Sequence, residues 1–213
     1  MFKKISVIGC GLIGSSILRA VEENKLASEV SVFDKSNHVN NYLKKNFSVS
    51  VCSNIAEAVK NSDLTIISSP LSSYKEILLS IKSDLKKNSI LTDTGSAKKE
   101  INKIISNFNL ENIHWIASHP IAGTEYSGPE AGFSNLFKNR WCILSADKQV
   151  SNDQISKLEK FWSKLGSKTK FMSFEDHDYV LLCLGENCYT EKPGDLNDLN
   201  LHKLQLKLAN KLS

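Results

Sequence analysis

A glycine-rich segment near the amino terminus, GCGLIG, constrains the fold of this chain more than any other feature. It has the spacing GxGxxG and joins an apolar stretch, Lys4–Ile8, that predicts a buried strand to a helically spaced stretch, Leu12–Glu23. In such a turn Gly9 permits the tight bend, Gly11 lets the backbone approach a phosphate, and Gly14 lets helix and strand pack closely. The amino terminus of the helix then presents N–H groups to a pyrophosphate.

Apolar strands and amphipathic helices continue to alternate along the chain. We expect further strands at residues 30–33, 48–51, 64–68, 90–92, 113–117, 141–145 and 169–172, and further helices at 54–60, 74–85, 97–105 and 155–165. The predicted strands are mostly apolar, which is typical of strands covered on both faces. Alternating strands and helices indicate βαβ units. The predicted fold class is α/β, a doubly wound, mostly parallel sheet of the Rossmann type, over residues 1–178, followed by a short atypical tail at 179–213.

An acidic residue follows the second predicted strand, where a dinucleotide-binding domain reads the adenosine ribose. Asp34 lies 20 residues after Gly14, and a carboxylate there accepts hydrogen bonds from the ribose hydroxyls and repels the 2′-phosphate of NADP. The sequence therefore predicts NAD as the preferred cofactor. Ser69 and Pro70 end the fourth predicted strand, and they either line the nucleotide crevice or simply stop the strand. The candidate cofactor-binding residues are Gly9, Gly11, Leu12, Ile13, Gly14, Asp34, Ser69 and Pro70.

Two polar segments follow later strands, at the sheet edge where doubly wound folds bind their ligands. TDTGSAK begins at Thr92, and HPIAGTEYSG begins at His119 in what we expect to be a loop of small residues. A lone histidine is more often structural, but imidazole titrates near neutral pH and suits acid–base chemistry. Ser96 either takes part in this chemistry or caps the helix that follows it.

Together with GCGLIGSS, the segments TDTGSAK and HPIAGTEYSG make the chain resemble the prephenate dehydrogenase family, which includes arogenate and cyclohexadienyl dehydrogenases. The resemblance runs from residue 3 to about 180. It implies NAD-dependent oxidative decarboxylation of prephenate to 4-hydroxyphenylpyruvate, a step of tyrosine biosynthesis, with arogenate as the alternative substrate. Asp176-His177-Asp178 is similar to the stretch that closes the family's nucleotide-binding domain, and we interpret His177 as a helix-start or hinge residue.

The resemblance also implies roles for individual residues. His119 is the expected catalytic group, which accepts the hydrogen bond of the substrate hydroxyl, and Ser96 is expected to bond the same hydroxyl and orient His119. The expected substrate pocket has Glu125 at its mouth, with Thr124 and Ser127 as further lining residues. The alternative for His119 is a hydrogen-bonded loop histidine without a catalytic role.

The match to the family stops near Leu182. The family has a second, helical domain that forms a homodimer, closes the active site and supplies an arginine for a substrate carboxylate. Here CLGEN stands at residues 183–187, where that domain is expected to begin, and the last arginine is Arg140. We hypothesise that the tail is truncated or out of frame, through a reading-frame shift near codon 182, so that the dimer domain is missing. The alternative is a genuine short protein with a Leu-rich tail. The chain is then either an active enzyme or a fragment that binds NAD without turnover.

Composition narrows the functional classes further. Lys and Arg number 27 against 23 Asp and Glu, without a block of like charges, and only two of the basic residues are arginine; this argues against a nucleic-acid partner. Apolar runs stay below the roughly 18 residues of a membrane span. Five cysteines without CxxC spacing argue against a disulfide framework or a metal site and favour the reducing cytoplasm. Composition thus leads us to expect no nucleic acid, membrane or metal, while the family resemblance implies a small-molecule substrate, prephenate or arogenate.

A β-hydroxyacid dehydrogenase on the same fold is the remaining rival. Such an enzyme has its own glycine-rich substrate loop and a catalytic lysine on a later helix. The segment HPIAGTE stands in place of that loop and counts against the rival, although fold alone does not decide between them.

Overall fold

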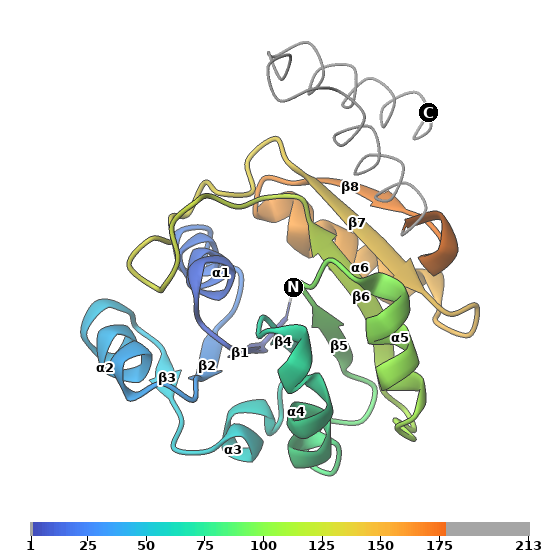
Figure 1. The fold of residues 1–213 in the computed structure, drawn as a ribbon, viewed down its shortest axis with the longest axis horizontal. Coiled ribbons are helices and arrows are strands. Elements are labelled where there is room, and N and C mark those ends of the chain that lie inside the picture. The colour runs from blue at the N-terminus through green and yellow to red at the C-terminus, as the bar shows by residue number, and fades with distance from the viewer. Residues whose placement is uncertain (1, 178–213) are drawn as a thin grey trace, which may run out of the picture.

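The computed structural model describes residues 2–177, and their eight strands form one sheet in the order β3-β2-β1-β4-β5-β6-β7-β8 (Figure 1). All neighbouring strands are parallel except β6 and β7, which are antiparallel. The predicted doubly wound, mostly parallel sheet is confirmed. The strands are β1 Lys4–Ile8, β2 Glu29–Phe33, β3 Ser50–Val51, β4 Leu64–Ile67, β5 Ile90–Asp93, β6 His114–Pro120, β7 Trp141–Ala146 and β8 Lys168–Phe171.

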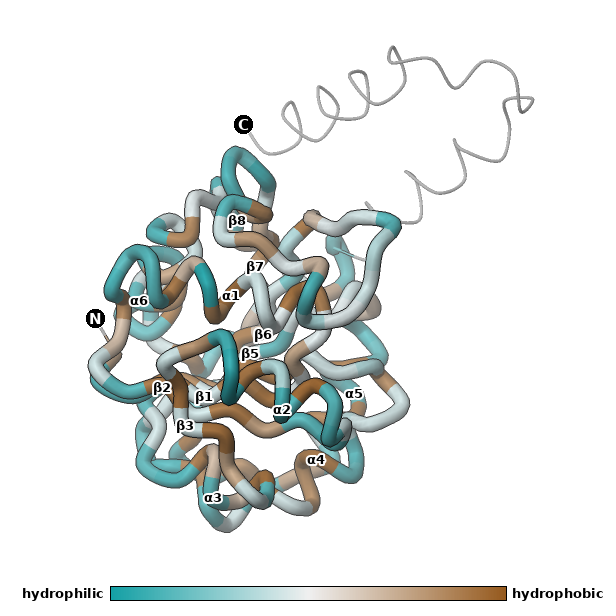
Figure 2. Tube along the Cα trace, turned by 90° about the vertical axis from the view of Figure 1, so that its left-hand side faces the viewer, coloured by the Kyte–Doolittle hydropathy of each residue, from teal (hydrophilic) through white to brown (hydrophobic). Residues whose placement is uncertain are grey.

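Helices cover both faces of the sheet (Figure 1). Apolar side chains of α1, α2 and α6 pack with the sheet in one core cluster, and those of α3, α4 and α5 pack in the other. Figure 2 shows the hydrophobic stretches running along the inner strands, with hydrophilic stretches mostly on the outside. The helices are α1 Leu12–Glu23, α2 Asn37–Asn46, α3 Ile55–Val59, α4 Tyr74–Ile81, α5 Lys98–Ser106 and α6 Asn152–Lys164, with a 3-10 turn η1 at Leu71–Ser73.

Capping side chains explain where two of the shorter helices begin. The side chain of Asn54 accepts a hydrogen bond from the Glu57 N–H at 2.9 Å and so caps α3. Ser36 caps α2 in the same way, by accepting from the Val39 N–H. Among the described residues, no helix is both long and apolar enough to cross a membrane.

Strand β6 extends further than the sequence indicates, and this changes the setting of His119. We expected the strand to end at residue 117 and His119 to lie in a loop. The structure instead pairs His119 with Ile143 and Pro120 with Cys142 of the antiparallel strand β7. The prediction of a loop is wrong, because a pairing with residues more than twenty positions away prolongs the strand. His119 is therefore held on a backbone with sheet hydrogen bonding.

The order of the strands reverses at β1, which has β2 on one side and β4 on the other. In doubly wound folds ligands bind in the crevice at the carboxyl ends of the strands, at this point of reversal. The boundary predicted at residue 178 and the predicted tail at 179–213 lie outside the described residues.

Candidate functional site

The glycine turn between β1 and α1 has two tightly packed positions, Gly9 and Gly14, and one open position, Gly11, as expected for a phosphate-binding turn. Gly9 has φ +86°, and a Cβ there would collide with the Ser69 hydroxyl and the Ser68 carbonyl. A Cβ at Gly14 would collide with the Gly9 carbonyl oxygen, so Gly14 lets α1 approach β1. A Cβ at Gly11 would meet nothing within 4 Å. The backbone at Gly11 is thus open to a ligand at the amino terminus of α1, where helical N–H groups have no intrahelical partner.

Asp34 follows β2 and contacts the glycine turn directly. One carboxylate oxygen, Oδ2, accepts a hydrogen bond from the Cys10 N–H at 2.8 Å, and the other, Oδ1, accepts from the Ser36 N–H at 2.8 Å. Each carboxylate oxygen has a second lone pair, so Asp34 retains acceptor capacity for ribose hydroxyls. Burial, together with the negative charge of Asp34, raises the pKa of the Cys10 thiol far above its usual range, which keeps this cysteine of the turn protonated.

A cleft of about 640 Å³ opens beside this turn, within the size range of small-molecule and cofactor sites. Of the predicted cofactor-binding residues, Gly14 alone is not part of its lining, since it packs beneath the turn. Ser69 and Pro70 follow β4 and line the cleft. The lining comprises Ile8, Gly9, Gly11, Leu12, Ile13, Phe33, Asp34, Lys35, Val39, Ile55, Ser68, Ser69, Pro70, Ser73, Glu76, Ile77, Ser80, Thr94 and Gly95.

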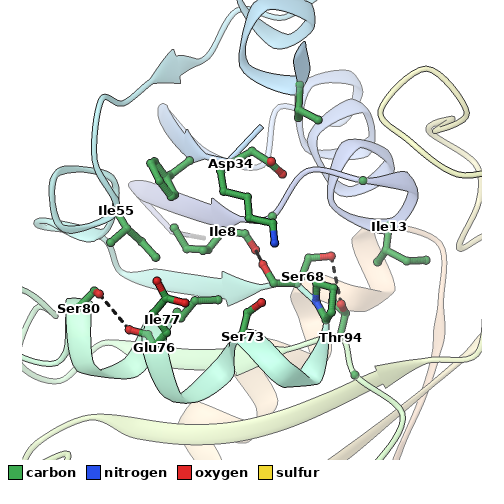
Figure 3. Close-up of a pocket in the computed structure, with 18 of the residues that line it drawn as sticks. Ile8, Ile13, Asp34, Ile55, Ser68, Ser73, Glu76, Ile77, Ser80 and Thr94 are labelled. Carbon is green, nitrogen blue, oxygen red and sulfur yellow. Dashed lines mark hydrogen bonds between the residues drawn. The ribbon is translucent and has the colours of Figure 1, made fainter. Parts of the chain in front are cut away.

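The wall formed by α4 was not anticipated from the sequence. Figure 3 shows Ser73, Glu76 and Ile77 on the opposite side of the cleft from Asp34, with Ser68 between them. The apolar spacing of α4 predicts its buried face, but it does not show which polar side chains on the edge of the helix face a ligand. A signal was available in the serine-proline segment that precedes α4, because it places the start of this helix at the ligand-binding edge.

The carboxyl ends of four neighbouring strands are joined by hydrogen bonds into one continuous edge. The Gly9 N–H donates to Phe33 O at 2.9 Å, which links β1 to β2. The Ser68 N–H donates to Ile8 O at 2.7 Å, which links β4 to β1. The Thr94 hydroxyl donates to the Ser68 hydroxyl at 3.1 Å, so the turn after β5 joins the same edge (Figure 3). This edge leads from Asp34 at one end of the cleft to the TDTGSAK turn at the other.

A buried ion pair lies at the TDTGSAK end of this sheet edge. Asp93 and Lys98 are both 0% exposed, and Lys98 Nζ lies 2.7 Å from each carboxylate oxygen of Asp93. The same ammonium donates to Ser118 O at 2.6 Å, and the Ser118 N–H donates to Asp93 Oδ1 at 3.1 Å. The pair therefore ties β5 and α5 to β6 at the residue that precedes His119.

His119 is half-buried on β6 and its Nδ1 lies 2.9 Å from Nε2 of His177. His177 stands in the helical turn that starts after β8, so the expectation of a helix-start residue is confirmed. The sequence did not indicate its contact with His119. The strand register is what brings the two together, since β8 pairs with β7 and β7 with β6.

The other expected active-site residues lie at the surface of the described structure. Ser96 is exposed in the turn between β5 and α5. The alternative of a helix cap is wrong for Ser96, because Ala97 occupies the cap position of α5. Thr124, Glu125 and Ser127 are exposed in the loop after β6. Their proposed roles at a substrate pocket stay predictions, as does the expectation that Ser96 bonds the substrate hydroxyl and orients His119.

A doubly wound sheet whose glycine turn opens onto a cleft at the strand reversal defines a dinucleotide-binding domain of the Rossmann type. The family model described as "Prephenate dehydrogenase, nucleotide-binding domain" matches residues 17–171. The chain belongs to this family.

Relatives support this assignment over most of the chain. The chain is 37% identical over 182 residues to a cyclohexadienyl dehydrogenase of Zymomonas mobilis, covering 85% of this chain and 62% of that protein. It is 31% identical over 180 residues to a prephenate dehydrogenase of Lactococcus lactis, covering 84% of this chain and 49% of that protein. The chain thus spans less than two thirds of the length of these relatives.

Solved structures of the same family share the fold. A prephenate dehydrogenase from Aquifex aeolicus superposes with a TM-score of 0.74 at 19% identity, covering 98% of this chain and 84% of that chain. An arogenate dehydrogenase from Synechocystis superposes with a TM-score of 0.74 at 23% identity, covering 99% of this chain and 74% of that chain. A further structure of the Aquifex aeolicus enzyme, with a TM-score of 0.72, is a complex with hydroxyphenyl propionate and NAD+.

Proposed function

We propose that the chain carries the cofactor site and the catalytic histidine for NAD-dependent oxidative decarboxylation of prephenate to 4-hydroxyphenylpyruvate. Arogenate is the alternative substrate, since the relatives include a cyclohexadienyl and a prephenate dehydrogenase. One observation carries the proposal: the carboxyl ends of β1, β4 and β5 form one edge along the cleft, and the buried pair joins β5 to the strand that holds His119. A cofactor seated along this edge has its reactive end near His119.

The residues of the cleft fit a dinucleotide. Gly11 leaves room for a pyrophosphate at the start of α1, and Leu12 and Ile13 continue the lining there. Asp34 sits at the end of β2 with acceptor capacity for the ribose hydroxyls. A negative charge at this position disfavours a 2′-phosphate, so we propose NAD over NADP. Ser69 and Pro70 line the same cleft on the side of β4.

The chemistry that NAD supplies when bound is acceptance of the hydride from C4 of the substrate ring. The protein's own task is the proton of the C4 hydroxyl. We assign its acceptance to His119, because imidazole is the side chain best suited to take up a proton near neutral pH. The carboxylate on the ring then leaves as CO2, and its bonding electrons complete the aromatic ring. The phenolate oxygen formed at C4 takes the proton back from His119, so atoms and charge balance. Ser96 is assigned a hydrogen bond to the same hydroxyl, and Glu125 a polar contact at the mouth of the pocket.

The test is NADH formation by the purified 213-residue chain with NAD and prephenate, beside arogenate. His119→Asn removes the proton acceptor, and we expect about a 10²- to 10⁴-fold loss of kcat, the range for general acid–base groups. His114→Asn is the matched control, because His114 begins the same strand and is also half-buried. Equal rates in His119→Asn and in the unaltered chain would refute the catalytic role.

The second candidate is a fragment that binds NAD without turnover. It is favoured by one observation: the chain spans 62% and 49% of the lengths of the two relatives. NAD binding by calorimetry, with no NADH formed from prephenate or arogenate, would support this candidate. Turnover that disappears in His119→Asn would exclude it.

A further inference from the structure

We propose that His177 is a positioning residue that holds His119 in the tautomer needed to accept a proton. The inference rests on the proposed function, because it concerns the group assigned to take the substrate's proton. Nδ1 of His119 and Nε2 of His177 lie 2.9 Å apart, which is hydrogen-bond distance. The two rings have centroids 5.1 Å apart and planes tilted by 59°, so they meet edge to edge and do not stack.

The turn that carries His177 is built to hold this side chain in place. The Asp176 N–H donates to the Ser173 hydroxyl at 3.0 Å, and that hydroxyl donates to the Asp176 carboxylate at 2.9 Å. The His177 N–H donates to Ser173 O at 3.0 Å. Reciprocal bonds of this kind are a helix capping arrangement, which fixes the first turn of the helix. The backbone of His177 is thus anchored directly after β8.

Packing against β6 fixes the same turn from the other side. Phe174 is 7% exposed and belongs to the core cluster that contains Trp115 and Ala117. These two residues precede His119 by four and two positions on β6, so all three side chains share one face of the strand. His177, 1% exposed, therefore approaches His119 on a packed face of the sheet, where few waters compete for the hydrogen bond.

The contact leaves two neutral arrangements of protons, and the proposed chemistry selects one of them. In the first, Nδ1–H of His119 donates to Nε2 of His177, and Nε2 of His119 carries a lone pair. In the second, Nε2–H of His177 donates to Nδ1 of His119, and the proton of His119 is on Nε2. A proton acceptor whose Nδ1 is engaged by His177 has to take the substrate's proton at Nε2. The first arrangement is thus the competent one, and it requires His177 as acceptor.

This arrangement also helps the reaction as charge develops. When Nε2 of His119 takes the hydroxyl proton, its ring becomes an imidazolium, and the Nδ1–H bond to His177 becomes charge-assisted and stronger. The proton on Nδ1 stays where it is. His177 therefore acts through His119 and does not touch the substrate in this scheme.

Nitrogen-detected NMR of the ¹⁵N-histidine-labelled 213-residue chain tests the proposal without substrate or cofactor. Spectra are taken above about pH 8, where ordinary histidines are neutral, and His119→Asn identifies the signals of His119. We expect His119 as the Nδ1–H tautomer in the unaltered chain. In His177→Phe, which keeps a ring and removes the acceptor, we expect the tautomer ratio to shift about three- to tenfold towards Nε2–H, as for the loss of one hydrogen bond. His177→Gln, whose amide oxygen can accept, should keep the Nδ1–H form.

The outcomes separate this inference from the proposed function. His119 found as the Nε2–H tautomer, or a ratio unchanged in His177→Phe, overturns the positioning role even if the chain forms NADH. If His177→Phe does not fold, the tautomer of His119 is compared between the unaltered chain and His177→Gln. Loss of the Nδ1–H form of His119 in His177→Gln then overturns the positioning role. The Nδ1–H tautomer without NADH formation would support the positioning contact while contradicting the activity. In an active chain we expect His177→Phe to lower kcat with the KM for NAD unchanged, and His177→Gln to restore kcat.

Discussion

Replacement of Lys98 by methionine removes one half of the buried ion pair and keeps most of the side-chain volume. Lys98 and Asp93 are 0% exposed, and the ammonium lies 2.7 Å from both carboxylate oxygens. Methionine leaves the Asp93 carboxylate in the interior with its bonds from the Gly95 N–H at 2.8 Å, the Ser118 N–H at 3.1 Å and the Tyr74 hydroxyl at 3.1 Å. Three neutral donors do not balance a full negative charge in a region of low dielectric.

The expected size follows from the geometry. At this separation two unit charges attract by about 6 kcal/mol for an effective dielectric of about 20. Desolvation of the two ions costs several kcal/mol each and offsets most of this attraction. The intact pair therefore contributes little net stability, whereas loss of one partner leaves a buried charge alone and costs about 3–5 kcal/mol. We expect Lys98→Met and Asp93→Asn each to lower the free energy of unfolding by that amount.

Urea unfolding of the two single variants and the double variant measures the coupling. With both charges removed, we expect the double variant to cost about as much as one single variant, which corresponds to a coupling of about 3–5 kcal/mol. Lys103→Met on the exposed side of the same helix is the control, with an expected change within about 0.5 kcal/mol. Additive single effects, to within about 0.5 kcal/mol, would show that the two charges do not depend on each other and would refute this reasoning.

Three further predictions concern the cleft and the thiols. We expect Gly14→Ala to destabilise the fold, because its Cβ collides with the backbone of Gly9. Gly11→Ala should unfold near the unaltered midpoint, while its NAD affinity falls at least tenfold in calorimetry; equal stabilities of the two variants would contradict this. Asp34→Asn should raise the affinity for NADP relative to NAD, since the repelling charge is lost, and an unchanged ratio in competition titrations would argue against the assigned role. Burial raises the pKa of Cys10 and, less completely, of half-buried Cys52. Both cysteines therefore carry little thiolate near pH 8, and Cys10 carries the least. Iodoacetamide labelling at that pH, read by peptide mass spectrometry, should modify Cys52 well before Cys10. Equal labelling of the two thiols would contradict the burial of Cys10.

The part of the fold that sequence predicts best is the part set by short-range pattern. The bounds of β1 and α1 agree with the predicted Lys4–Ile8 and Leu12–Glu23, because a strand, a glycine turn and a helix each leave a local signature. Asp34 was placed by its spacing from the turn, and it lines the cleft. The sequence pattern does not distinguish helix α2 from a polar loop, since Leu43 is its one buried residue and so narrow an apolar stripe is a weak helical signal.

The features that sequence did not predict depend on contacts between distant segments. The extension of β6 through His119 requires pairing with β7 at Ile143, and no local pattern records that pairing. The approach of His177 to His119 depends on two successive strand registers and on the packing of Phe174. The motif identified His119 as a candidate catalytic residue. That His177 contacts it could be found only once the order of β6, β7 and β8 was known.

The buried pair has a consequence for function as well as for stability. Lys98 bonds the carbonyl of Ser118, and the next residue along β6 is His119; the glycine turn and Asp34 belong to β1 and β2, on the other side of β4. Loss of the lysine should therefore disturb the position of His119 more than the cofactor cleft. In a Lys98→Met chain that remains folded, we expect NAD affinity within about twofold of the unaltered value, while turnover falls by about 10²-fold, the cost of a displacement near 1 Å at a reacting group. If NAD affinity and turnover instead fell by the same factor, the loss of Lys98 would disturb the whole sheet edge from Asp34 to His119.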